Sequence, residues 1–154
     1  PAQVRLGLET CTSAKSRGVL TEHRGVSILD DSYNANADSM LTALRLLKDL
    51  PCTGRRIAVL GDMAELGEST LVSHEEVGRA AGELGVDLLI AVGTHSLVTL
   101  EAARRAGVAE SSGWPSLEPA LPVLKATVRP GDLILVKASR SAGLERVTEA
   151  LRET

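Results

Sequence analysis

The chain has 154 residues, a formal net charge of −3 and 44% hydrophobic residues, so it is long enough to bury one core of ordinary size. The acidic balance, the absence of a basic block and the aromatic content of 1% argue against a nucleic-acid-binding protein. We expect a cytoplasmic protein that does not span a membrane, because there is no apolar run of 18 residues and no signal-peptide pattern.

The first half of the chain predicts a hairpin followed by a polar segment and a helix. Residues 1–12 have weak helical character. Residues 19–23 and 26–29 are expected to be antiparallel strands joined by a tight turn. The polar cluster 30–36 follows the second strand directly. A helix then begins at the predicted N-cap Asp38 and ends before Pro51.

The second half alternates between apolar runs and helical patterns. The predicted strands are 55–60, 86–92, a weaker 108–112, and 133–136. The predicted helices are 69–84, 96–106, 117–127 and 141–152. Because the strands are apolar without alternation, they indicate a mostly parallel sheet covered on both faces. The sequence therefore predicts one α/β domain over residues 1–154, a three-layer Rossmann-like fold with an antiparallel N-terminal hairpin strand.

Polar groups gather where two of these strands end. The segment 30–36 follows one strand, and 61–68, with sequence GDMAELGE, follows the next. Open α/β sheets bind ligands at the carboxyl ends of their parallel strands, so a site for a polar ligand is expected there. The chain has neither a P-loop nor a G-x-G-x-x-G motif, and its two cysteines lack metal-ligand spacing.

Four motifs, in order, resemble the C-terminal domain of the Mur ligases. They are DSYNAN-DSM (31–36 and 38–40), LGDMAELGE (60–68), His74, and LVKASRS (135–141). The resemblance extends from about Arg17 to the end of the chain. The sequence departs from the family at Ala37, usually Pro, and at Ala138 and Leu144, often Gly and Met.

The resemblance implies a role in a ligase that uses ATP and Mg to activate a carboxylate as an acyl phosphate. In this family the first domain binds the UDP-sugar peptide, and the central domain carries the P-loop and the magnesium. The third domain closes over ATP and supplies the incoming amino compound. The pattern is most similar to members that join D-alanyl-D-alanine to UDP-N-acetylmuramoyl-tripeptide. The N-terminal and central domains would then be partners absent from this chain, and the chain alone is expected to be inactive.

The resemblance also suggests roles for individual residues. Asp31 would contact the ribose of the nucleotide. The other residues implied to bind the nucleotide are Tyr33, Asn34, Asn36 and Arg17. For the substrate they are Asp62, Glu65 and Ser139, and the catalytic candidates are Lys137 and Arg140, with no metal ligand. Each has a structural alternative: Asp31, Asp62 and Glu65 could cap loops, and Arg140 could pair with the final helix. The three histidines are expected to be structural.

Two other functions remain open at this point. A free-standing flavodoxin-like or receiver-like binding module is loosely compatible with Asp30, Asp31 and Lys137. A receiver also needs a phosphorylatable Asp after its third strand, where this chain has Gly93 and Thr94. A standalone transferase would need a nucleophile beside a base, and the sequence shows no Ser–His or Cys–His pairing.

Overall fold

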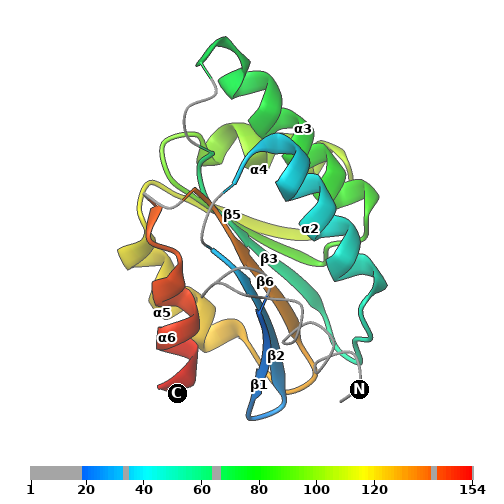
Figure 1. Cartoon of the computed structure of the whole chain (residues 1–154), viewed down its shortest axis with the longest axis vertical. Coiled ribbons are helices and arrows are strands. Elements are labelled where there is room, and N and C mark those ends of the chain that lie inside the picture. Colours follow the sequence, from blue (N-terminus) through cyan, green and yellow to red (C-terminus); the bar gives the residue numbers. More distant parts are fainter. Residues whose placement is uncertain (1–18, 33–34, 64–66, 140–141, 154) are drawn as a thin grey trace.

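Six strands form one sheet in the computed structural model, which describes residues 19–32, 35–63, 67–139 and 142–153 (Figure 1). The strands are β1 (Val19–His23), β2 (Val26–Asp31), β3 (Arg56–Leu60), β4 (Leu88–Val92), β5 (Glu110–Trp114) and β6 (Leu133–Lys137). Their order across the sheet is β1-β2-β6-β3-β4-β5. β1 pairs antiparallel with β2, and all other pairings are parallel.

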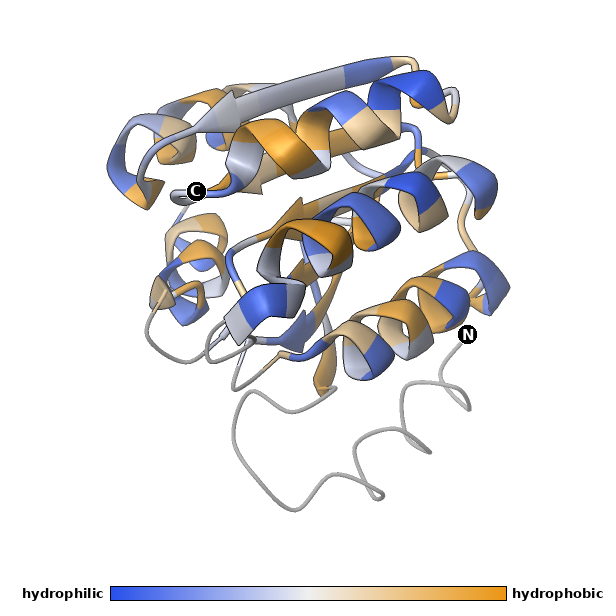
Figure 2. Cartoon of the chain, turned by 90° about the horizontal axis from the view of Figure 1, so that it is seen from above, coloured by the Kyte–Doolittle hydropathy of each residue, from blue (hydrophilic) through white to orange (hydrophobic). Residues whose placement is uncertain are grey.

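Helices cover both faces of the sheet. They are α2 (Ala37–Asp49), α3 (Thr70–Glu83), α4 (Ser96–Arg105), α5 (Leu117–Thr127) and α6 (Glu145–Arg152), with the 3₁₀ turn η1 (Gly67–Ser69) before α3. The buried apolar residues of α2 and α3, with Ala103 of α4, belong to one core, and those of α5 and α6 belong to another. Each helix carries both hydrophobic and hydrophilic residues, as a helix that buries one side requires (Figure 2).

Successive residues along a strand serve the two cores alternately. In β3, Ala58 and Leu60 lie in the core under α2 and α3, whereas Ile57 and Val59 lie in the core under α5 and α6. Strand side chains alternate between faces, so a strand covered on both sides must be apolar throughout. The predicted three-layer α/β fold is therefore confirmed.

The connections after β2 and β6 leave toward opposite faces of the sheet. α2 follows β2 on one face and α6 follows β6 on the other, although β2 and β6 are neighbours. Where adjacent connections leave toward opposite faces, the loops separate at the carboxyl ends of the strands. The point beyond Asp31 and Lys137, where these two connections diverge, is the switch point of the sheet.

Several predicted boundaries are wrong. β2 extends through Asp31, two residues beyond the predicted 26–29, and β4 begins at Leu88 and not at position 86. Asn36, and not Asp38, is the N-cap of α2, because its side-chain oxygen accepts from the Ser39 amide at 2.9 Å and the Ser39 hydroxyl accepts from the Asn36 amide at 3.0 Å. The strand placed at 108–112 is β5, two residues later. The amide of Val108 instead donates to Ala103 and closes α4. The final helix begins at Glu145, later than position 141. Residues 1–12, for which a weak helix was expected, lie outside the described residues.

Candidate active-site edge

Asp31 and Lys137 form an ion pair at the carboxyl ends of neighbouring strands. The two residues are register partners in the parallel pairing of β2 and β6. The Lys137 ammonium donates to the Asp31 carboxylate, with Nζ 2.8 Å from Oδ2. The Lys137 side chain is only 3% exposed and that of Asp31 is 25% exposed. A buried ammonium requires a charged partner, so the pair is held in place while part of Asp31 faces solvent.

Asp62, in the loop after β3, binds the start of the next helix. Its Oδ2 accepts from the Thr94 amide at 2.8 Å and its Oδ1 from the His95 amide at 3.0 Å. Gly93 has a φ of +119°, and a Cβ there would lie 2.5 Å from Asp62 Oδ2. The carboxylate therefore satisfies two backbone donors at the N-terminus of α4 and joins the loops after β3 and β4.

His74, in α3, holds the same loop from the other side. Its ring is buried, with Nδ1 2.7 Å from the Thr70 carbonyl and Nε2 3.1 Å from the Met63 amide. Because Met63 donates to Nε2, the hydrogen-bond pattern assigns the ring proton to Nδ1. Nε2 also lies 3.7 Å from Asp62 Oδ1. His74 therefore holds the loop that carries Asp62 in place. This contact was not predicted from sequence spacing.

Backbone hydrogen bonds bring the loop after β6 into this group. The Ser139 amide donates to the Asp62 carbonyl at 2.9 Å, and the Gly61 amide donates to the Lys137 carbonyl at 3.0 Å. The Ser139 side chain is buried. Asp31, Asp62, Lys137 and Ser139 therefore share one edge of the sheet, as the sequence predicted for a common site.

The remaining predicted site residues divide into two groups. Asn36 lies at the same edge, where it begins α2, and is exposed. The others lie outside the described residues: Arg17, Tyr33, Asn34, Glu65 and Arg140.

Among the described residues, no cluster of His, Cys, Asp or Glu is suited to hold a metal ion. None of the described helices is both long and apolar enough to cross a membrane.

A second buried ion pair lies at the opposite edge. The Arg55 guanidinium donates from Nη2 to Asp132 Oδ2 at 2.8 Å, and the backbone amides of Arg55 and Arg129 donate to the same carboxylate. Burial by itself raises the pKa of Asp132, but these hydrogen bonds outweigh it and hold the pKa below its usual value. The hydrogen bond to Asp132 raises the pKa of Arg55, despite the opposing effect of burial. This pair fastens the start of β6 to β3.

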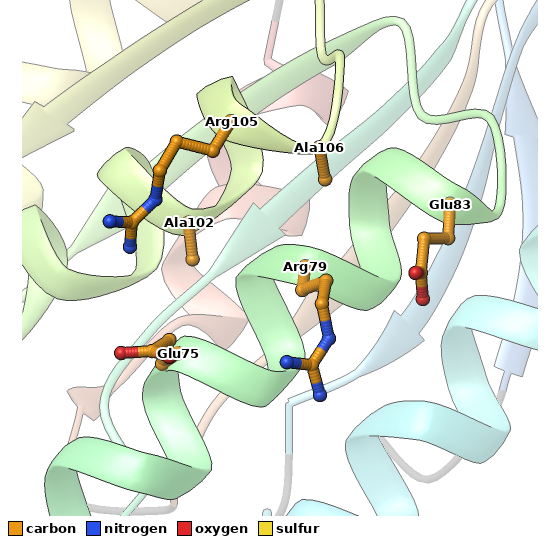
Figure 3. Close-up of a pocket in the computed structure, with 6 residues that line it drawn as sticks. All are labelled: Glu75, Arg79, Glu83, Ala102, Arg105 and Ala106. Atoms are coloured by element: carbon orange, nitrogen blue, oxygen red, sulfur yellow. The ribbon is translucent and has the colours of Figure 1, made fainter.

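A hollow of about 410 Å³ between α3 and α4 lies away from the candidate site. Figure 3 shows Glu75, Arg79 and Glu83 along α3, with Arg105 on the neighbouring α4. Acidic and basic residues alternate there, and none of the predicted site residues lines the hollow. We interpret it as a solvated groove between two helices rather than as the binding site.

The fold, together with Asp31, Asp62, Lys137 and Ser139 at one edge of the sheet, defines the class of protein. It is a Rossmann-like α/β domain with polar residues at the switch point of its sheet. The chain belongs to the Mur ligase family, since the model of "Mur ligase, glutamate ligase domain" matches residues 17–140. This confirms the resemblance seen in the motifs. It also disfavours the receiver-like and flavodoxin-like alternatives.

Named relatives agree with this assignment. The chain is 42% identical to the UDP-N-acetylmuramoyl-tripeptide–D-alanyl-D-alanine ligase of Mycobacterium tuberculosis over 152 residues, covering 86% of this chain and 30% of that protein. Identity to the ligase of the same name from Escherichia coli is 41%, covering 82% of this chain and 27% of that protein. The chain therefore spans about 30% of the length of the relatives it matches.

Solved structures show the same fold. MurF from Acinetobacter baumannii superposes with a TM-score of 0.83 at 32% identity, covering 97% of this chain and 33% of that one. MurF ligase from Thermotoga maritima, in complex with ADP, superposes with a TM-score of 0.73 at 29% identity, covering 92% of this chain and 31% of that one.

Proposed function

We propose that this chain is the C-terminal domain of an ATP-dependent ligase that joins D-alanyl-D-alanine to UDP-N-acetylmuramoyl-tripeptide in peptidoglycan synthesis. The observation that carries the proposal is the Asp31–Lys137 pair at the switch point, in a chain 42% identical to enzymes of that name. The N-terminal and central domains would be its partners. ATP and a UDP-linked substrate would place the reaction in the cytoplasm.

In this proposal, the residues at the carboxyl end of β2 bind the nucleotide. The partly exposed Asp31 carboxylate has acceptor capacity beyond its bond to Lys137, so it can accept from ribose hydroxyls. Lys137 orients Asp31 and supplies a point charge toward phosphate. Asn36, Asn34, Tyr33 and Arg17 complete this side of the proposal. ATP would supply the phosphoryl group that activates the substrate carboxylate, and Mg would be held mainly by the central domain.

The amino-substrate side is assigned to the loops after β3 and β6. Both Asp62 oxygens already accept backbone hydrogen bonds, so Asp62 would contribute chiefly by fixing the loop that precedes Glu65. Ser139 and Arg140 follow Lys137 directly, and an arginine can hold the dipeptide carboxylate bidentately. Arg140 and Lys137 remain the catalytic candidates.

The test is phosphate release by the full-length protein that contains this chain. With ATP, Mg and UDP-N-acetylmuramoyl-tripeptide present, we expect turnover that depends on D-alanyl-D-alanine. Replacement of the dipeptide by D-alanine or L-alanine is the matched control and should abolish turnover. Turnover supported by a single amino acid, and not by the dipeptide, would assign the protein to a different reaction within the family.

A further inference from the structure

We propose a second ligand site, for a small amphipathic anion, at the edge of the sheet opposite to Asp31 and Lys137. The site is a hollow of about 220 Å³ between the β1–β2 turn and the C-terminal parts of α5 and α6. We call it the basal hollow. Because β1 runs antiparallel to β2, its last residue, His23, pairs with Val26 at the start of β2, far along the strand from Asp31.

The floor of the basal hollow is aliphatic. Val26 at the start of β2, Val128 and Pro130 after α5, and Leu151 of α6 line it. The turn that borders it is fixed in place, since the Gly131 amide donates to the Gly25 carbonyl at 2.8 Å. Such a surface suits a hydrocarbon group. The volume lies below the range of about 300–1,000 Å³ that is typical of drug-sized ligands, so the apolar part of the ligand must be short.

Three cationic residues share the lining of the basal hollow with these aliphatic residues. Arg24, Lys125 and Arg129 all line the basal hollow and are exposed. None of them forms an ion pair with an acidic residue in the described part of the chain. In a protein with a net charge of −3, three cations that have no acidic partner among the described residues create a local preference for an anion at this apolar hollow.

His23 adds a hydrogen-bonding group to the same hollow. Its Nε2 is buried and has no hydrogen-bond partner among the described residues. Buried polar side-chain atoms are nearly always paired with protein or with another molecule. Because Nε2 is closed off from solvent, an anionic oxygen in the basal hollow would become its partner only after the His23 ring turns toward the hollow.

The backbone at Arg24 is an independent observation. Arg24 has a φ of +52° and Gly25 a φ of +83°, so both central residues of this turn are left-handed. Such a turn strongly favours Asn-Gly or Asp-Gly, and a long side chain at the first position costs stability. Arginine is therefore a poor choice for the turn itself but a suitable one for gripping a carboxylate or phosphate.

These observations define the ligand class as a carboxylate or phosphate monoester with a short aliphatic group. The test uses the 154-residue chain labelled with ¹⁵N and titrated with hexyl phosphate, and follows the backbone amide shifts. We expect saturable shifts centred on Arg24, Gly25, Val26 and Arg129. Inorganic phosphate, which lacks the apolar group, and hexanol, which lacks the charge, should each bind at least about tenfold more weakly.

The decisive variant is Arg24→Asn. It installs the residue pair that the turn prefers, so its melting temperature should equal or exceed that of the parent. Loss of one charge-assisted contact should nevertheless weaken hexyl phosphate binding about tenfold. Arg45→Ala, which removes an exposed arginine of α2, is the control with the same change in charge and should bind like the parent.

Three results would overturn the proposal. One is the absence of saturable shifts at the basal hollow, and another is equal affinity of hexyl phosphate and hexanol. The third is unchanged affinity in Arg24→Asn. Vesicles of phosphatidylglycerol distinguish the source of the anion: a soluble ligand predicts no binding to them, whereas binding abolished by Arg24→Asn would assign the site to a lipid headgroup instead. None of these outcomes depends on the ligase activity.

Discussion

The Asp31 carboxylate neutralises a buried lysine in this structure, and its side chain is still partly exposed. In the full-length ligase we expect Asp31→Ala to raise the KM for ATP about 10- to 100-fold, because hydrogen bonds to a charged acceptor are lost. Steady-state kinetics with varied ATP measure this. Asp38→Asn, in the exposed first turn of α2, removes a nearby carboxylate and should leave the kinetics unchanged. An unaltered KM in Asp31→Ala would remove Asp31 from the nucleotide site.

Asp132 makes stability depend on acid pH. The native pKa of Asp132 lies below its ordinary value, so folding favours the ionised form. The contribution of Asp132 to the free energy of unfolding is therefore fully present above the unfolded-state pKa of about 3.9. It is lost as the pH falls through the lower native pKa. Urea unfolding of the chain between pH 7 and pH 2 should show this loss.

Asp132→Asn tests whether the charge of Asp132 causes this loss of stability, because it removes the charge and keeps the shape of the side chain. It should destabilise the chain by about 3 kcal/mol at pH 7, because Arg55 loses its buried partner. The difference between variant and parent should shrink toward pH 2. A difference independent of pH would show that the charge of Asp132 does not contribute.

At the scale of single elements, α2 depends on a capping box that includes a predicted ligand residue. Asn36→Ala should lower stability by about 1 kcal/mol, since the Ser39 amide loses its acceptor. Asn36→Ser retains a good N-cap but removes the amide group. If Asn36 also binds the nucleotide, the serine variant should melt like the parent and yet raise the KM for ATP. Equal KM values would make Asn36 a cap and nothing more.

The contact between α3 and α4 depends on Gly78. A Cβ at this position would lie 2.2 Å from the Thr99 carbonyl oxygen and 3.0 Å from the Ala102 side chain. Gly78→Ala should therefore push the helices apart and destabilise the chain by about 1–3 kcal/mol, although alanine favours helix. Chemical denaturation measures the change. Arg79→Ala, on the exposed side of α3, should stay within about 0.5 kcal/mol of the parent.

At the scale of the whole molecule, the proposed function requires a second domain to complete the candidate site. Asp31, Asp62 and Lys137 meet at one edge of the sheet, but the phosphate-binding loop expected of an ATP-dependent ligase is not in this chain. We therefore predict no phosphate release by the 154-residue chain with ATP, Mg and both peptide substrates. Nucleotide binding, followed by calorimetry, should be weak. Sustained turnover by the chain alone would contradict the proposed division of labour among domains.

Residue order along the chain was sufficient to predict the layers, and it placed the candidate site at the carboxyl ends of the strands. Apolar runs without alternation indicated strands covered on both faces, and polar segments after them indicated the functional edge. Both inferences use local patterns, and the structure confirms the fold. The roles of Tyr33, Asn34, Glu65, Arg17 and Arg140 stay predictions.

Contacts between distant segments required the tertiary structure. Nothing in local sequence indicates that Asp62 caps α4, that His74 holds the Met63 amide, or that Lys137 is buried against Asp31 across 106 positions. Such pairings depend on which strands become neighbours, because β6 inserts between β2 and β3 only when the chain folds back. Local patterning thus determined the elements and the edge at which the candidate site was predicted, whereas strand order decided which side chains meet there.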